Sequence, residues 1–340
     1  MSGHPLLGII GVVLIAVVNY DAVRTTLSAS NSGPITRQLG RGIWSLFLGL
    51  HRLHRNHRML KIAGPGITLL LLLCWIAIEW LGWFLLFCST SDAVVNSTTS
   101  ASASLIERAY FAGFTITTLG YGDFAPGGAP WQLLAVIAAV NGFFVLTLSV
   151  TYTLSVVSAA SEKRQLAQAI NTLGETPYHI VELNADEGRF ESLAQQMQSL
   201  NLSLLGLAQK HLAYPLLHYY HSADEDSVLP LALAKLDQAL AISLFACPDM
   251  PSTSRTQLLV SQKTLAWFQG TLKNAFISPS RQTPEIPELA CYQQLPFCHE
   301  SPAAIAAHLK SLDRQRLLKA YIEKDGWQWS CVWSRDKKAS

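Results

Sequence analysis

The chain has 340 residues, of which 50% are hydrophobic and 14% are charged, and its formal net charge is +2. Soluble domains carry about 25% charged residues, so this composition favours a membrane part joined to a soluble part. The second half of the chain balances its acids and bases and has no basic run, which argues against a nucleic-acid partner. Its six cysteines include no CxxC pair, so we expect reduced thiols and no disulfide framework.

Three apolar stretches are candidates for membrane spans, which need about 17–25 residues. The first is Pro5–Tyr20, within an N-terminal segment 1–23. The second is Gly66–Cys88, which contains one charge, Glu79. The third is Trp131–Val157, which contains none. We predict three crossings, and we expect the helix of the last one to extend beyond the membrane into the cytosol.

The charges between these spans predict their orientation. Residues 24–63 contain several arginines and a lysine but no acid, whereas the segment 89–104 contains Asp92 and no cation. The positive-inside rule then places 24–63 in the cytosol, the N-terminus outside and the C-terminal tail in the cytosol. The expected location is a plasma membrane or bacterial inner membrane. A cleaved signal peptide over residues 1–30 is an alternative, but its start lacks the usual cation.

The basic segment 24–63 also contains an amphipathic stretch, Gly42–Arg58. Its apolar residues alternate with Arg and His, which predicts a helix in the cytosolic membrane interface, with Trp44 at headgroup level. An ordinary basic loop is the alternative. Because the histidines, His51 among them, alternate with arginines, we expect headgroup contacts rather than metal ligands.

A short helix is predicted between the second and third spans. Ser104 and Glu107 form a capping-box pattern at its start. The helix would cover residues 105–117 and would be about 20 Å long, too short to cross the membrane. Non-helical backbone at membrane depth is tolerated only where it is buried in protein or lines water. The run that follows, 118–123, is therefore predicted to line a pore.

That run belongs to the sequence Thr-Thr-Leu-Gly-Tyr-Gly-Asp at 117–123, which resembles the Thr-x-Gly-Tyr-Gly signature of the potassium channel family. The resemblance covers residues 64–160 as a pore domain. It implies an all-α membrane protein, a tetrameric pore-loop channel with a mostly helical cytosolic domain. Because the chain contains one filter strand and no internal repeat, three identical subunits are the expected partners.

The resemblance assigns roles to the filter residues, which are Thr118, Leu119, Gly120, Tyr121, Gly122 and Asp123. The carbonyls of the first four would bind K⁺ ions, and no organic cofactor is expected. The two glycines reach backbone angles that a Cβ penalises. The tyrosine ring would brace the filter against the pore helix, and the aspartate would attract cations at the outer mouth.

Further residues of the pore domain are candidates for gating. Gly142 has the family's spacing for a hinge in the inner helix, with a packing glycine as the alternative. Thr147, Thr151 and Ser155 recur on one helical face and are predicted to line the inner cavity. Their hydroxyls could instead bond carbonyls one turn back or neighbouring helices.

Glu79 is the one acid within the second span, and an intramembrane carboxylate usually has a partner. We predict that it supports the pore helix together with Tyr110. Proton sensing by Glu79 is the alternative role.

The tail, 161–340, is predicted to be a cytosolic domain of about five helices. The helical stretches and their Pro-rich connector are Glu187–Leu212, Ser227–Phe245, Ser252–Phe276, Ser278–Pro296 and Ser301–Glu323. Two clusters, His218 with His221 and Cys291 with Cys298-His299, lack convincing metal spacing. Trp327 and Trp329 are either core residues or a ligand cage.

The sequence therefore predicts a channel that conducts K⁺ passively and is gated by the tail through the inner helix. Membrane lipids and an unknown tail ligand are the further partners expected, and no span has the arginine spacing of a voltage sensor. The chain is not expected to be an enzyme, because it has no nucleophile–base motif. The alternative is a non-enzymatic membrane sensor or scaffold with a weakly conducting pore.

Overall fold

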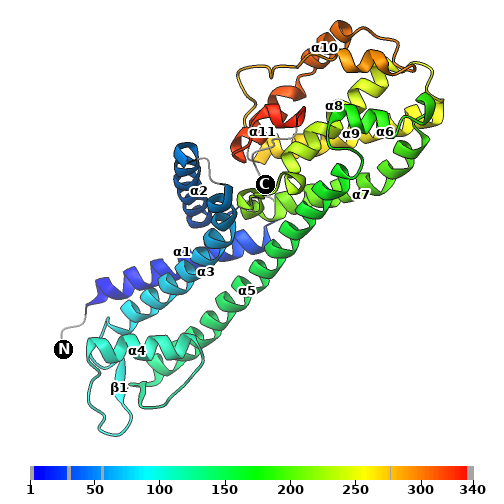
Figure 1. Ribbon diagram of the computed structural model, residues 1–340. Helices are drawn as coiled ribbons and strands as arrows, with labels where there is room; N and C mark the ends of the chain where they lie inside the picture. Colours follow the sequence, from blue (N-terminus) through cyan, green and yellow to red (C-terminus); the bar gives the residue numbers. More distant parts are fainter. Residues whose placement is uncertain (1–3, 29–31, 55–56, 276, 335–340) are drawn as a thin grey trace. The chain divides into compact units, whose positions relative to one another are not determined.

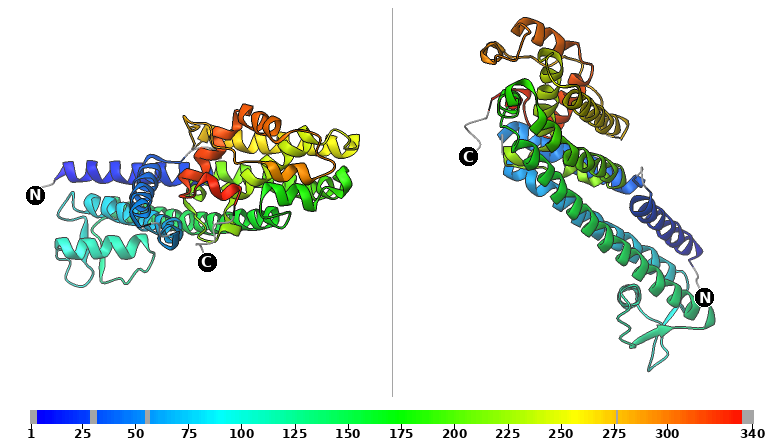
Figure 2. Two further views of the ribbon diagram at one scale, coloured as in Figure 1. Left: turned by 45° about the horizontal axis from the view of Figure 1, so that its top comes forward. Right: turned by 90° about the vertical axis from the view of Figure 1, so that its right-hand side faces the viewer.

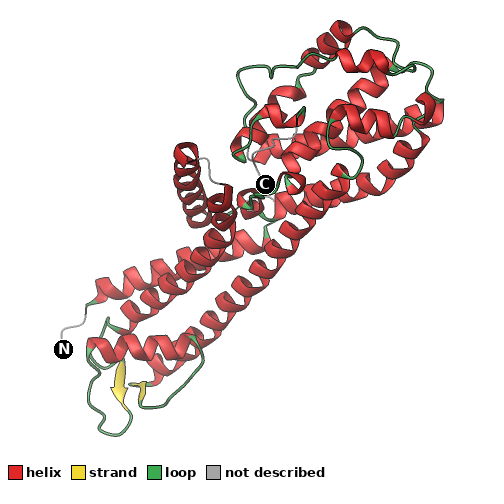
Figure 3. Cartoon of the chain, in the orientation of Figure 1, coloured by secondary structure: helices red, strands yellow, loops and turns green. Residues whose placement is uncertain are grey.

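The computed structural model describes residues 4–28, 32–54, 57–275 and 277–334, and these are mostly helical (Figure 3). The helices are α1 (Pro5–Leu27), α2 (Pro34–His54), α3 (His57–Phe87), α4 (Leu105–Ile116), α5 (Ala129–Asn171), α6 (Pro177–Leu183), α7 (Glu191–Ala213), α8 (Leu229–Ala246), α9 (Ser252–Ala275), α10 (Pro302–Ser311) and α11 (Arg314–Lys324) (Figure 1). Two short strands, β1 (Val94–Asn96) and β2 (Phe124–Pro126), pair antiparallel. The predicted all-α membrane fold is confirmed.

The chain divides into two compact units. The membrane unit contains residues 1–43 and 65–156, and the C-terminal unit contains residues 44–64 and 157–340. The sequence predicted a different boundary, with 24–63 as one separate segment and the tail beginning at 161. In the structure, residues 44–64 fold with the tail.

Helices α1, α3 and α5 are each long and apolar enough to cross a membrane, and they correspond to the three predicted spans. Helix α5 runs on to Asn171, so the expected outward extension of the last span is confirmed. Helix α8 also has a suitable length and composition. However, it is buried within the C-terminal unit, where α6, α9, α10 and α11 pack against it. It is therefore the core helix of that unit.

A buried aspartate joins the first two helices. Asp21 of α1 is fully buried and accepts hydrogen bonds from the Ile35 amide at 2.7 Å and from the Thr36 hydroxyl at 2.7 Å. The Trp75 indole of α3 donates to the same carboxylate at 2.9 Å. The carboxylate thus satisfies an amide in the first turn of α2, where the helix dipole favours negative charge.

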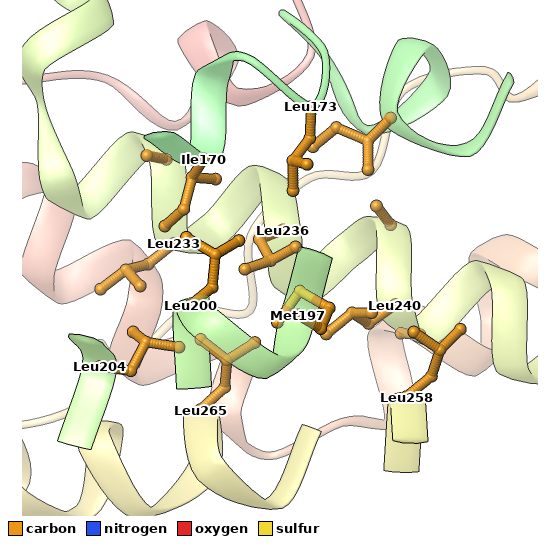
Figure 4. Packing of buried hydrophobic residues seen from close by; sticks show 14 of the residues in the cluster. Ile170, Leu173, Met197, Leu200, Leu204, Leu233, Leu236, Leu240, Leu258 and Leu265 are labelled. Atoms are coloured by element: carbon orange, nitrogen blue, oxygen red, sulfur yellow. The ribbon is translucent and has the colours of Figure 1, made fainter. Parts of the chain in front are cut away.

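The C-terminal unit has one large apolar core (Figure 4). Apolar side chains from α5, α7, α8 and α9 meet there, including Ile170, Met197, Leu233 and Leu265. The 3.6-residue spacing of apolar residues in α7 and α9 fits this packing, since it puts them on one helical face. Trp327 and Trp329 are both buried in one apolar cluster, as the core alternative expects, although Trp329 also lines a cavity described below.

The predicted tail helices correspond closely to α7, α8 and α9, although residue 276, the predicted end of α9, lies outside the described residues. The stretch predicted as one helix over 301–323 is two helices, α10 and α11. They are separated where Leu312 takes an extended conformation. The short helix α6 was not predicted, because seven residues are too few to show a clear apolar period.

Two buried ion pairs hold α8 in this core. Lys235 lies 3.3 Å from Glu225, and Asp237 lies 2.8 Å from Arg314. A buried charge without a partner would destabilise the fold strongly, so these pairs make the α8 position specific.

Candidate functional site

The predicted pore helix corresponds to α4 of the membrane unit, and the names pore helix and filter are kept below for α4 and for residues 118–123. Its capping box is formed as predicted: the Glu107 amide donates to the Ser104 hydroxyl, and the Ser104 amide donates to the Glu107 carboxylate at 2.7 Å. The helix has 12 residues and is therefore about 18 Å long. Thr117, predicted as its last residue, is its C-cap.

The filter run 118–123 has an unusual backbone. Thr118, Gly120 and Gly122 have φ angles of 60°, 57° and 84°, while the residues between them do not have positive φ. Positive φ costs a residue with a Cβ about 1–2 kcal/mol, which explains two of the three identities. A Cβ on Gly120 or Gly122 would have open space around it, so backbone conformation, not crowding, requires glycine here.

Aromatic rings connect the filter to the pore helix. The ring of Tyr121 stacks on Tyr110 with centroids 6.1 Å apart, and it meets the Phe114 ring edge-on at 6.1 Å. These contacts attach the filter to α4 on the side that carries Tyr121.

Arg108 is a site residue that the sequence analysis missed. Its side chain is buried in α4 and donates to four backbone carbonyls, those of Phe87, Thr90, Ser91 and Ala103. The end of α3, the outer loop and the start of α4 are thereby joined at one guanidinium. The sequence signal was an arginine in a short helix between apolar spans, but carbonyl partners leave no trace in side-chain patterns.

The outer loop forms a small sheet around β1. Strand β1 pairs with β2 on one side, with Asn96 opposite Phe124. On its other side, Val95 bridges to Ser102. The sheet and α4 lie together at the end of the membrane unit where α3 ends and α5 begins (Figure 2). This sheet continues directly into the filter.

Gly142 lies against the C-terminal end of α4. A Cβ at this position would be 2.2 Å from the Ile116 carbonyl oxygen, and α5 is a continuous helix through it. The structure therefore assigns Gly142 a packing role, the alternative weighed from the sequence. A hinge at Gly142 stays a prediction.

The predicted cavity-lining hydroxyls bond to their own helix. The Thr147 hydroxyl donates to the Phe143 carbonyl at 2.8 Å, and the Ser155 hydroxyl donates to the Thr151 carbonyl at 2.9 Å. Thr147 and Thr151 are exposed on the single chain, and Ser155 is partly exposed. Back-bonded hydroxyls and a pore-facing position are compatible, so the cavity role stays a prediction.

Glu79 joins a polar network between helices. Its carboxylate accepts from the Trp83 indole at 2.8 Å and from the Asn19 amide of α1 at 3.2 Å. Asn19 also accepts from Asn141 of α5 at 2.8 Å. The predicted support of the pore helix by Glu79 with Tyr110 is thus corrected. Glu79 bonds to α1 and to its own helix, and Trp80 holds the pore helix by donating to the Ala109 carbonyl at 2.8 Å.

The amphipathic segment 44–64 has a different role from the predicted one. Trp44 is buried, and its ring lies 5.6 Å from that of Tyr219 in the tail. His51 is buried as well, with its Nε2 3.2 Å from the Gly326 carbonyl oxygen. The predictions of headgroup contacts for Trp44 and His51 are therefore wrong, because both side chains pack inside the C-terminal unit. Helix α2 begins at Pro34, eight residues before the predicted helix, and residues 55–56 lie outside the described residues.

A histidine cluster lies within the C-terminal unit, where the segment 44–64 packs against the tail. His57 Nδ1 is 3.2 Å from His221 Nε2, and His221 Nδ1 is 3.4 Å from the Asp325 carboxylate. Burial and the neighbouring Lys163 lower the pKa of His218 to about 3, so it is neutral in the folded unit. Within the described part of the chain, no group of three or more His, Cys, Asp or Glu side chains could hold a metal ion.

The C-terminal unit also contains a cavity of 550 Å³. Its walls include Tyr178, Trp329 and Trp333, and the Lys319 side chain lines it at 16% exposure. The acid paired with this lysine, Glu323, is 3.9 Å away and half exposed. Glu285 and Glu288 also line this aromatic cavity, so its lining carries both signs of charge and is suited to a small organic molecule with polar groups.

Comparison with known proteins adds to this geometry. Residues 70–159 match the family model Ion_trans_2, described as an ion channel. The uncharacterized membrane protein YdjJ of Bacillus subtilis (strain 168) is 32% identical over 326 residues, which cover 94% of this chain and 94% of that protein. No solved structure matches the chain. The likeness to YdjJ spans both units.

Proposed function

Since the chain belongs to the same family as YdjJ and carries an ion channel domain, we propose that it is a potassium-selective channel, conducting K⁺ passively. The observation that carries the proposal is the alternation of positive φ at Thr118, Gly120 and Gly122, directly after a capped 12-residue helix. Such alternation lets successive carbonyls turn toward a common axis. Rings of backbone carbonyls are how K⁺ channels replace the hydration shell of the ion.

The carbonyls of Thr118, Leu119, Gly120 and Tyr121 would bind the ions. Asp123 would raise the cation concentration at the outer mouth. The C-terminal end of α4 carries partial negative charge and would stabilise a cation in the cavity below the filter. Leu119 replaces a β-branched residue common in the family, but its carbonyl chemistry is the same.

One chain supplies a quarter of such a ring, so the proposal requires a homotetramer. Exposed apolar side chains run along α5, among them Leu133, Val140 and Leu154. In a bilayer, such faces would contact lipid or the neighbouring subunits. In this proposal, 24–63 and the C-terminal unit lie on the cytosolic side and the N-terminus lies outside, as the positive-inside rule favours.

Gating by the C-terminal unit is the second part of the proposal. Helix α5 enters this unit without a break, so a rearrangement there has a direct mechanical route to the inner helix. The 550 Å³ cavity is the proposed site of the tail ligand. Its wall includes Thr176 and Tyr178, which follow closely after α5 ends.

The proposal is tested by ion flux into vesicles that contain the purified protein. We expect uptake that is larger for K⁺ than for Na⁺ and that falls at least about tenfold in Gly120→Ala, because alanine is strained at φ 57°. Tyr121→Ala should also reduce uptake. Equal uptake of Na⁺ would end the claim of selectivity. No uptake at all would favour the sensor or scaffold function.

A further inference from the structure

The outer end of the filter has a hydrogen-bonding partner outside the pore helix. Ser97 follows β1 directly, and its hydroxyl donates to the Gly122 carbonyl at 2.6 Å. Its amide donates to the Asp123 carbonyl at 3.0 Å. One residue of the outer loop therefore binds two consecutive filter carbonyls.

This arrangement extends the sheet of the outer loop. The pairing of Asn96 with Phe124 is the last step of the β1–β2 ladder, and Ser97 lies one residue further toward the filter. The turn beyond Ser97 is closed by the Ser100 amide, which donates to the Asn96 carbonyl at 2.9 Å. Ser97 is thus held by a hydrogen-bonded turn rather than by a loose loop.

The consequence concerns which carbonyls are available to ions. Oxygens that accept from Ser97 point toward the outer loop, so the carbonyls of Gly122 and Asp123 are directed away from the ion path. Gly122 has φ 84°, and the hydrogen bond from the Ser97 hydroxyl is the one that its carbonyl accepts among the described residues. A glycine peptide flips easily when its hydrogen bond is lost.

We infer that Ser97 is a positioning residue that ends the ring of K⁺-binding carbonyls at Tyr121. The inference rests on the proposed channel function. It assigns the outer loop a part in selectivity: the Ser97 hydroxyl holds one orientation of the Gly122 carbonyl in each subunit. Without this hydroxyl, the Gly122 carbonyl of each subunit points either toward the pore axis or away from it. The four subunits then no longer present the same set of oxygens to the ions.

The test compares Ser97→Ala with two other variants in the full-length protein. Ser97→Thr keeps the hydroxyl. Ser102→Ala removes an exposed hydroxyl from the same small sheet, where no hydrogen bond depends on it among the described residues. The measured quantity is the ratio of K⁺ to Na⁺ permeability in vesicles. Because Ser97 is exposed, its loss should leave folding unchanged.

We expect the permeability ratio to fall about fivefold in Ser97→Ala, the effect of one neutral hydrogen bond on a two-state orientation. Ser97→Thr and Ser102→Ala should keep the wild-type ratio. An unchanged ratio in Ser97→Ala, or an equal fall in Ser102→Ala, would overturn the inference.

A second measurement separates the failure of this inference from that of the channel proposal. Amide hydrogen exchange is compared over residues 120–127 in the wild type and Ser97→Ala. Faster exchange in Ser97→Ala than in the wild type supports the positioning role. If the vesicles also show no flux, only the channel proposal fails. Equal exchange in both proteins overturns the positioning role regardless of flux.

Discussion

The two units satisfy their buried polar groups in different ways. In the membrane unit, the buried cation Arg108 donates to four backbone carbonyls, while the buried acids Asp21 and Glu79 accept from tryptophan side chains. In the C-terminal unit, buried charges pair with side chains, as Lys235 does with Glu225. Backbone geometry is encoded over a few adjacent residues, whereas side-chain pairs depend on the whole fold. A short motif can therefore predict a local backbone conformation, but not which distant segments fold together.

The largest effect on K⁺ flux is expected in the membrane unit at Gly142, where the backbone of α5 lies against the backbone of α4. In Gly142→Ala, the new methyl would be 2.2 Å from the Ile116 oxygen, and neither helix can yield locally. Overpacking costs about 1–3 kcal/mol, and here it would displace the end of α4 and abolish K⁺ flux. Gly66→Ala in α3, where a Cβ meets no atom within 4 Å, is the matched control. Flux equal to wild type in Gly142→Ala would show that the packing role is dispensable.

The next largest effect is a loss of stability when Arg108 is replaced. In Arg108→Gln, several buried carbonyls lose their donor, and we expect a loss of about 3 kcal/mol in unfolding free energy. Thermal unfolding of the detergent-solubilised protein measures it. Arg108→Lys should lie between Gln and the wild type, since an ammonium group keeps the charge but reaches fewer carbonyls. A wild-type melting temperature for Arg108→Gln would contradict the claim that backbone partners stabilise this unit.

The stability of the C-terminal unit should depend on pH. The pKa of His218 is lowered to about 3, so the folded state stays neutral while the unfolded chain takes up a proton below its pKa of about 6.5. Stability therefore falls as the pH drops through 6.5, by about 2 kcal/mol at pH 5. The lowered pKa of Asp325 acts only below its usual value of 3.8, outside this window.

Unfolding measured at pH 7.5 and pH 5 checks this prediction. In His218→Gln, the difference between the two pH values should shrink, while the exposed His179→Gln should behave as the wild type. Part of the difference will persist in His218→Gln, because burial also lowers the pKa of His211. An identical pH dependence in His218→Gln and the wild type would show that His218 is not buried in solution.

The smallest effect is expected at Thr147. Its hydroxyl already bonds to the Phe143 carbonyl of its own helix, so Thr147→Val should change stability by no more than about 0.5 kcal/mol. We expect K⁺ flux within about twofold of the wild type. Ser149→Ala, which removes a buried hydroxyl bonded to Val145, is the comparison. A large drop in flux for Thr147→Val alone would place its hydroxyl in the ion path.

The sequence predicted elements whose causes are local. The capping box of Ser104 and Glu107 involves four consecutive residues, and the structure forms it as expected. The long apolar helices follow from composition alone. In contrast, the roles predicted for Trp44, His51 and Glu79 were wrong, because their partners are Tyr219, the Gly326 carbonyl and Asn19. These partners are from 60 to 275 positions away along the chain.

By itself, the sequence determined that this chain is an all-α membrane protein with a short capped helix between two long apolar helices and a glycine-containing run after it. Each of these features depends on residues within one or two helical turns. Only the tertiary structure decided that residues 44–64 belong to the C-terminal unit, that Arg108 gathers four carbonyls and that Ser97 binds the filter. The physical reason is that every residue carries the same backbone carbonyl, so the pattern of side chains in the sequence does not indicate which donor will bind it.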